Sequence, residues 1–259
     1  MSSLAERLLS GDPDERNAAI EEVAEPVDPT VTEALGRLVV NTDIGTDART
    51  AAAAALGRVP GDESASRLRD LLLAEDAGVR GLAAAGLAGR PGPDSVNALL
   101  GVLGDPVNTV RNVAERGLLA MPDVVREHGL ARLEELLDHP EPLTRSPAAR
   151  LIGAVEATEL FEPLARVAAT DTEWLPRMWA TRALGDLAVP GAIDVLAERL
   201  AHDDKNRVRA AAAETLGELR HERSRALLKQ ALDDPDEGVC SAAEDALAEL
   251  GRAAFDDDD

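Results

Sequence analysis

Apolar side chains recur at intervals of three and four residues along most of this chain, which is the spacing of one face of an α-helix. Clear examples are SVNALLGVL at 95–103, AIDVLAERL at 192–200 and SRALLKQAL at 224–232. Polar turns rich in Asp and Pro separate such stretches, as in GDPDE at 11–15 and DDPDE at 233–237. Aspartate caps helix starts, and proline cannot continue a helix from within. The pattern therefore predicts short helices joined by tight turns, with essentially no strand.

The helical pattern repeats along the chain in a fixed frame. One position of the frame is an arginine, and an aliphatic residue follows it seven positions later. Successive members of this arginine column lie 31 to 34 residues apart, and the last repeat has cysteine instead. The column consists of Arg16, Arg49, Arg80, Arg111, Arg145, Arg177, Arg209 and Cys240. The aliphatic positions are Val23, Leu56, Leu87, Leu118, Ile152, Leu184, Leu216 and Leu247. Eight repeats are therefore predicted, each a hairpin of two helices.

The repeats also predict the domain organisation. A single hairpin cannot bury its apolar face, so neighbouring hairpins must stack around one continuous core. We therefore expect an all-α fold, a curved α-solenoid superhelix of eight hairpins that forms one domain over residues 1–252. The units span about residues 3–26, 27–59, 60–90, 91–121, 122–155, 156–188, 189–220 and 221–252. In the fifth unit, Pro147 directly follows Ser146, which predicts a second helix that begins with Ser146 as its N-cap. Residues 253–259 end in FDDDD and are predicted to be a disordered acidic tail.

These repeats resemble HEAT repeats of the short, alanine-rich type that also occurs in the phycobilin lyase family. The resemblance covers roughly residues 3–251 and is carried by the column arginine, the alanine run and the Leu-Gly pair near the helix end. The segment DKNRVRAAAAETLGELR around Arg209 shows all three. The resemblance implies a stacked solenoid, and it implies that the column arginines bond to turn aspartates of their own or the neighbouring repeat. It does not indicate a particular activity.

The composition indicates which residues form the core and in what environment the protein works. Hydrophobic residues make up 45% of the chain but aromatic residues only 2%, so the core must be built from Ala, Leu and Val. There is no apolar run of about 18 residues and no secretory signal, so we expect a cytoplasmic protein without a membrane span. We also expect a monomer. The formal net charge is -22, and Lys205 and Lys229 are the only lysines. This combination resembles proteins of extreme halophiles, because a screening length of about 3 Å at molar salt cancels much of the repulsion between acidic side chains.

Residues that often carry catalysis form no recognisable constellation. The histidines, His128, His139, His202 and His221, are scattered without the spacing of metal ligands, and Cys240 has no second cysteine to pair with. The His221-Glu222 dipeptide resembles those of the iron-binding HEAT hydroxylases, which use several such dipeptides, and one is too few. Phosphate-loop, dinucleotide-binding and nucleophile-elbow motifs are absent from the sequence. The sequence therefore predicts a protein that is not an enzyme and has no metal or cofactor.

An arginine row in the central repeats is the strongest candidate site. In each second helix, the position five residues after the arginine column faces away from the core at 100° per residue. This position is arginine in three consecutive repeats, at Arg116, Arg150 and Arg182. Trp174 lies in a turn near the row and is expected to add an exposed indole, whereas Trp179 is interpreted as a core residue. The alternative is that these arginines are solvated and neutralised by acids such as Glu115 and Asp186.

Several functions are consistent with these features. The first is a non-catalytic scaffold or adaptor that binds another protein on its concave face, with an acidic segment or a phosphate-bearing ligand at the arginine row. The second is a nucleic-acid-binding protein or a HEAT-like DNA glycosylase with a cationic groove. The acidity of the chain makes nucleic acid an unfavourable partner. A third is a bilin lyase-like accessory subunit, which only the repeat type supports. We expect the scaffold.

Overall fold

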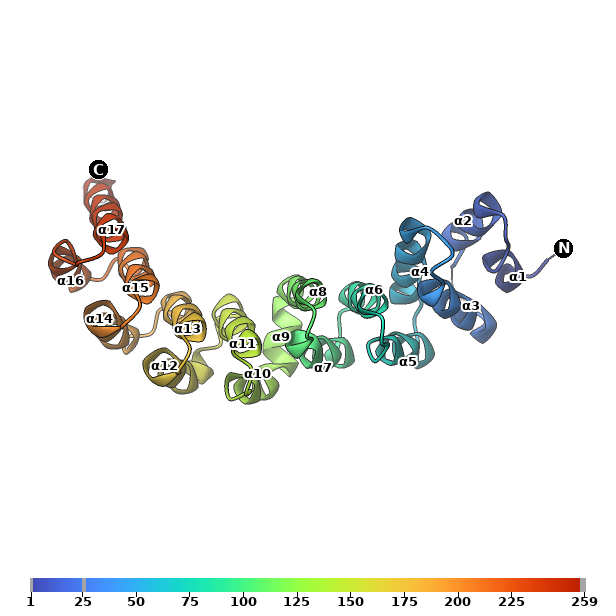
Figure 1. Ribbon diagram of the computed structural model, residues 1–259, viewed down its shortest axis with the longest axis horizontal. Coiled ribbons are helices and arrows are strands. Elements are labelled where there is room, and N and C mark those ends of the chain that lie inside the picture. Colours follow the sequence, from blue (N-terminus) through green and yellow to red (C-terminus); the bar gives the residue numbers. More distant parts are fainter. Residues whose placement is uncertain (1, 25–26, 257–259) are drawn as a thin grey trace. The chain divides into compact units, whose positions relative to one another are not determined.

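Helices make up most of the chain (Figure 1). The computed structural model describes residues 2–24 and 27–256, and it describes side chains as far as residue 251. Within these ranges it contains α-helices and two short 3-10 helices, and no strand. The prediction of an all-α fold is therefore confirmed.

The chain divides into two compact units, residues 1–129 and residues 130–259, and each is described by itself. The boundary between them falls inside the fifth predicted repeat, 122–155. That repeat holds three helices instead of two. Its helices are α9 (Pro122–His128), α10 (Leu130–Leu137) and α11 (Pro142–Ala154). The extra helix α9 belongs to the first unit, and α10 and α11 belong to the second.

The first unit is a succession of helix hairpins. Its other helices are α1 (Leu4–Leu8), α2 (Pro13–Glu21), α3 (Pro29–Val40), α4 (Thr46–Arg58), α5 (Asp62–Leu71), α6 (Ala77–Ala88), α7 (Pro93–Gly101), η1 (Val102–Gly104) and α8 (Asn108–Leu119). Turn aspartates cap several of them: the Asp12 carboxylate accepts the backbone N–H of Asp14 at 2.9 Å. Pro13 follows in the first turn, where no N–H is required, and Asp28 with Pro29 repeats this arrangement at α3.

The second unit consists of four hairpins in two layers (Figure 1). After α10 and α11 come η2 (Thr158–Leu160), α12 (Phe161–Thr170), α13 (Trp174–Leu187), α14 (Ala192–His202), α15 (Asn206–Glu218), α16 (Ser224–Ala231) and α17 (Glu237–Asp256). The second helices of the hairpins, α11, α13, α15 and α17, pack side by side in chain order. We call these four helices the second-helix layer.

Glycine allows the helices of this layer to approach each other closely. At Gly185 in α13, a Cβ atom would lie 2.2 Å from Cγ2 of Thr215 in α15. At Gly217 in α15, a Cβ atom would lie 2.6 Å from Cβ of Ala246 in α17. Both distances are too short for a real side chain, so the Leu-Gly pair of the repeat has a packing cause.

Helix α11 differs from the prediction of a late start. It begins at Pro142, with Pro147 inside it. Pro142 occupies the first turn, where its missing N–H costs nothing, so an earlier proline already starts the helix. Pro147 removes one backbone donor from the helix interior. The Ser146 hydroxyl donates to the carbonyl of Pro142 at 2.9 Å. The prediction that Ser146 caps this helix was therefore wrong.

The last helix extends into the predicted acidic tail. Helix α17 runs to Asp256, so residues 253–256 have a helical backbone. Ala253 and Ala254 favour this continuation, because alanine is the best helix former. Residues 257–259 lie outside the described part of the chain.

Candidate functional site

Several arginines of the column form buried ion pairs with aspartates of the next repeat. Nε and Nη2 of Arg177 donate to the two carboxylate oxygens of Asp203, both at 2.8 Å. The side chains of Arg177 and Asp203 are only 8% and 1% exposed. Pairs of the same two-point kind are Arg145 with Asp171, Arg209 with Asp234 and, in the first unit, Arg80 with Asp105. Each pair joins one repeat to the next.

A second set of hydrogen bonds ties these arginines to their own turns. Nη1 of Arg177 donates to the backbone carbonyl of Asp171 at 2.9 Å, and Nη1 of Arg209 donates to that of Asp203 at 2.9 Å. In the last repeat, Sγ of Cys240 takes the place of the guanidinium, 3.2 Å from the carbonyl of Asp234. One continuous chain of bonds therefore runs through the second unit. This Arg–Asp ladder consists of Arg145, Asp171, Arg177, Asp203, Arg209, Asp234 and Cys240.

The paired aspartates also close the turns that carry them. Oδ1 of Asp234 accepts the backbone N–H of Asp236 at 2.9 Å. The hydrogen bond from Arg209 holds the pKa of Asp234 below its ordinary value. In the first unit, Arg80 lowers the pKa of Asp105 in the same way. Because a buried carboxylate is tolerated only with such partners, the ladder is a structural element.

The other three arginines of the column bond mainly to the backbone. Arg16 donates to the carbonyl of Ser10 at 3.1 Å, and Arg49 donates to that of Val39 at 2.9 Å. Arg111 donates to the carbonyl of Asp105 at 2.6 Å. These arginines also fix turns of their own hairpins.

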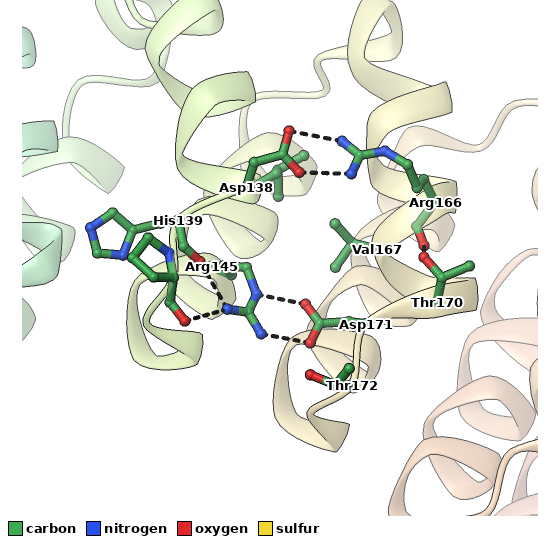
Figure 2. Close-up of a pocket in the computed structure, with 10 residues that line it drawn as sticks. Asp138, His139, Arg145, Arg166, Val167, Thr170, Asp171 and Thr172 are labelled. Atoms are coloured by element: carbon green, nitrogen blue, oxygen red, sulfur yellow. Dashed lines mark hydrogen bonds and ion pairs between the residues drawn. The ribbon is translucent and has the colours of Figure 1, made fainter.

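A surface cavity of about 310 Å³ lies between two neighbouring hairpins of the second unit (Figure 2). Its walls hold two ion pairs, Arg145 with Asp171 and Arg166 with Asp138, and Val167 lies between them. Arg145 also donates to two backbone carbonyls. Both guanidinium groups of this cavity are therefore engaged by the protein itself. The cavity is a gap between structural ion pairs and offers a ligand little unpaired charge.

In the second-helix layer, Trp179 of α13 lies beside two arginines of the predicted row. Cζ of Arg150 in α11 is 4.6 Å from the centre of the Trp179 ring, and Cζ of Arg182 is 5.8 Å from it. Both distances lie within the cation–π range. Arg182 also forms an ion pair with Glu214 of α15, in which each side chain is 44% exposed. We call Arg150, Trp179 and Arg182 the Arg–Trp cluster.

Two of the predicted site residues, Arg150 and Arg182, lie together within the second unit. Arg116 lies on α8 in the first unit, whereas the Arg–Trp cluster lies in the second. Trp174 is the first residue of α13, and Cζ of Arg207 is 5.2 Å from its ring. The indole beside the arginine row therefore belongs to Trp179 and not to Trp174. Trp179 lies beside Arg182 because residues three apart on a helix share a face. Trp179 is half-buried and not the core residue of our interpretation.

Acidic side chains lie beside the Arg–Trp cluster on the second-helix layer. The register that holds Arg150 and Arg182 continues with Glu214 and Asp245. Four residues further along their helices lie three more exposed carboxylates. These five residues, Asp186, Glu214, Glu218, Asp245 and Glu249, form the acidic row. This row was not among the predicted sites, although the frame that located the arginines also aligns Asp186, Glu218 and Glu249.

The acids of this row act on one another. Desolvation raises the pKa of Asp186, the charge of Glu156 adds to the effect, and Arg182 opposes it. Desolvation likewise raises the pKa of Glu218, and the charges of Asp186, Glu214 and Glu249 add to it against Arg182. The layer therefore carries negative charge that Arg182 only partly compensates.

Two other features, a metal site and a membrane-spanning helix, are absent from the described residues. No group of three or more His, Cys, Asp or Glu side chains there is arranged to hold a metal ion. None of the helices in that part of the chain is long and apolar enough to cross a membrane.

The stacked hairpins and the Arg–Asp ladder define an α-solenoid repeat protein. Sequence comparison finds HEAT repeats at residues 1–88, 46–119, 130–217 and 203–257. The chain belongs to the HEAT-repeat family. Comparison with curated protein sequences gives no significant match.

Solved structures of other proteins share this fold. Kap121p is 14% identical, with a TM-score of 0.59 over 97% of this chain and 37% of that protein. The complex of CpcE and CpcF of phycocyanin lyase from Nostoc sp. PCC7120 is similar over 59% of this chain and 97% of the matched one, at 22% identity and a TM-score of 0.53. YibA of Escherichia coli is 18% identical, with a TM-score of 0.50 over 95% of this chain and 91% of YibA. At these identities the likeness is one of fold alone.

Proposed function

We propose that this protein is a non-catalytic scaffold or adaptor that binds an acidic segment of another protein on its second-helix layer. The observation that carries the proposal is the Arg–Trp cluster, in which two arginines flank a half-buried indole on an accessible layer of helices. Tryptophan and arginine are the residues most enriched among those that dominate binding energy at protein interfaces. Guanidinium groups hold carboxylates through paired hydrogen bonds.

Arg182 of the cluster differs from Arg177 of the ladder in how exposed its ion pairs are. Arg177 of the ladder is 8% exposed and donates to two aspartates and two backbone carbonyls. Arg182 is 44% exposed, and its ion-pair partner Glu214 is equally exposed. Exposed ion pairs contribute only about 0–1 kcal/mol. A carboxylate from a partner can therefore replace Glu214 at small cost, whereas Arg177 cannot be released without unfolding its turn.

The alternatives have weaker support. A nucleic acid would meet the acidic row next to the cluster on a chain with a net charge of -22, and phosphate repulsion opposes such binding. A bilin lyase-like accessory subunit is supported by the likeness of fold to the phycocyanin lyase complex alone.

The test is affinity capture with the full chain and two variants. Arg150→Glu/Arg182→Glu reverses the charge of the cluster. The matched control, Arg132→Glu/Arg223→Glu, reverses two exposed, ion-paired arginines outside the second-helix layer. We expect proteins with acidic segments to be captured by the wild type and the control and lost from the cluster variant. Circular dichroism checks that all three chains are folded. Capture of the same proteins by the cluster variant contradicts the proposal.

We further propose that the protein works in a cytoplasm of high salt concentration. The support is its charge: 49 acidic residues, 27 basic ones, and only two lysines among the latter. At molar salt the long-range part of charge attraction is screened, so paired hydrogen bonds and indole contacts at the cluster supply most of the affinity.

A further inference from the structure

We infer that the bound partner segment is bipolar, with acidic residues where it crosses α11 and α13 and basic residues where it crosses α15 and α17. The inference rests on the proposed function and specifies the charge order of the ligand at that same layer. It comes from the change of sign along one register of the stack.

This register holds Arg150, Arg182, Glu214 and Asp245 on four successive helices. The ion pair between Arg182 and Glu214 spans α13 and α15, so one step along the stack brings side chains of this register into contact. The helices on either side of this step also pack directly against their neighbours, α11 on α13 and α15 on α17. The positive and negative halves are therefore adjoining parts of one surface.

The negative half has more charge than its neighbours neutralise. Besides Glu214 and Asp245 it holds Glu218 and Glu249, both exposed, and the exposed Asp186 at the end of α13 adjoins it. The charges of Asp186, Glu214 and Glu249 all disfavour the ionised form of Glu218, and Arg182 opposes them from the edge of the row. Cationic side chains of a ligand would relieve this repulsion.

A layer of this kind selects ligands by charge order. A uniformly acidic segment is attracted at α11 and α13 and repelled at α15 and α17, and a uniformly basic segment experiences the opposite. A segment with one block of each sign is attracted at both ends. Complementary potentials of this kind favour the right partner and reject others through like-charge contact.

The probes are fluorescein-labelled peptides of about 12 residues, because an extended chain at about 3.3 Å per residue then spans four helices packed roughly 10 Å apart. The block peptide has an acidic half and a basic half. The alternating peptide has the same composition in alternating order, and the acidic peptide has only acidic residues. Fluorescence anisotropy with the full chain measures each Kd at about 0.1 M salt, where charge contacts are still felt over about 10 Å.

We expect the block peptide to bind at least about tenfold more tightly than the alternating one. Glu218→Gln/Glu249→Gln should reduce this advantage to less than about threefold and should not weaken the acidic peptide. The control, Glu198→Gln, should change neither value, since Glu198 is exposed on α14, outside the second-helix layer.

The outcomes separate this inference from the proposed function. Equal binding of block and alternating peptides, or an unchanged advantage in Glu218→Gln/Glu249→Gln, overturns the bipolar ligand and leaves the scaffold intact. An acidic peptide that binds Arg150→Gln/Arg182→Gln as tightly as the wild type overturns the cluster as a site. If no peptide binds the folded wild type at millimolar concentration, both are wrong.

Discussion

Replacement of Arg177 by methionine tests whether the Arg–Asp ladder holds neighbouring repeats together. Methionine keeps an unbranched apolar stem and removes the charge. The change leaves the carboxylate of Asp203, which is 1% exposed, without its two-point partner. Asp203 keeps the backbone N–H of Lys205 at 3.0 Å and Nη1 of Arg199 at 3.3 Å.

The expected loss follows from this stranded charge. Breaking a buried ion pair by removing one partner costs about 3–5 kcal/mol of unfolding free energy. Because Asp203 retains two donors, we expect the lower end, about 3 kcal/mol, and a Tm lower by about 10 °C. The double variant Arg177→Met/Asp203→Asn removes the stranded charge and should recover roughly half of the loss. Arg182→Met on the same helix breaks only an exposed pair and should cost less than about 1 kcal/mol.

Urea unfolding followed by circular dichroism measures the free energies. Hydrogen exchange of α13 and α15 locates the loss, because repeat arrays do not always unfold in one step. We expect faster exchange in these two helices in Arg177→Met and unchanged exchange in Arg182→Met. If Arg177→Met is no more destabilising than Arg182→Met, or if the double variant is as unstable as the single one, the ladder does not hold the repeats together.

Three further predictions concern packing, charge and salt. Gly185→Ala should destabilise the protein by about 1–3 kcal/mol in urea unfolding, because the new Cβ would lie 2.2 Å from Thr215. The control Gly251→Ala, which has nothing within 4 Å of the new Cβ, should stabilise the protein by up to about 1 kcal/mol. Equal effects of the two variants would contradict the packing argument. Asp186→Asn and Glu218→Gln should each raise the Tm at neutral pH, because folding raises the pKa of both acids and so penalises their charged forms. That gain should shrink as pH falls through the folded-state pKa and vanish below the ordinary carboxyl range, and a gain that persists there would refute the cause. Thermal melts from molar to millimolar KCl should show a falling Tm, because 49 acidic residues repel one another when unscreened; a Tm that is flat or rises would argue against adaptation to salt.

Much of the fold could be predicted because a repeat constrains every unit at once. The 31 to 34 residue frame aligns all members of the arginine column, so helix faces and turns could be inferred together. The outward position of Arg150 and Arg182 followed from the helical period alone. The acidic row was accessible to the same reasoning, since Asp186, Glu218 and Glu249 share one position of the frame.

Other features depend on contacts that a frame does not specify. Trp179 lies beside Arg150 because α11 packs against α13 at a particular offset, and periodicity within one helix carries no such information. The extra helix α9 arises from residues that continue the helical pattern of the fifth repeat, so the pattern could not show that the helix is broken near Gly129. The start of α11 was misplaced because two prolines, Pro142 and Pro147, both suit a first turn.

The ladder has a direction along the chain. Each of its guanidinium groups reaches forward to an aspartate 25 or 26 residues later, as Arg177 reaches Asp203 and Arg209 reaches Asp234. During synthesis from the N-terminus, a hairpin therefore emerges from the ribosome before the carboxylate that secures it, and each hairpin is completed only by its successor. A truncation therefore leaves a different group at each end. Removing a C-terminal hairpin leaves an arginine that loses its aspartate and keeps the carbonyl of its own turn, as Arg209 would. Removing an N-terminal hairpin leaves an aspartate that loses its arginine and keeps the backbone N–H of its own turn, as Asp234 would.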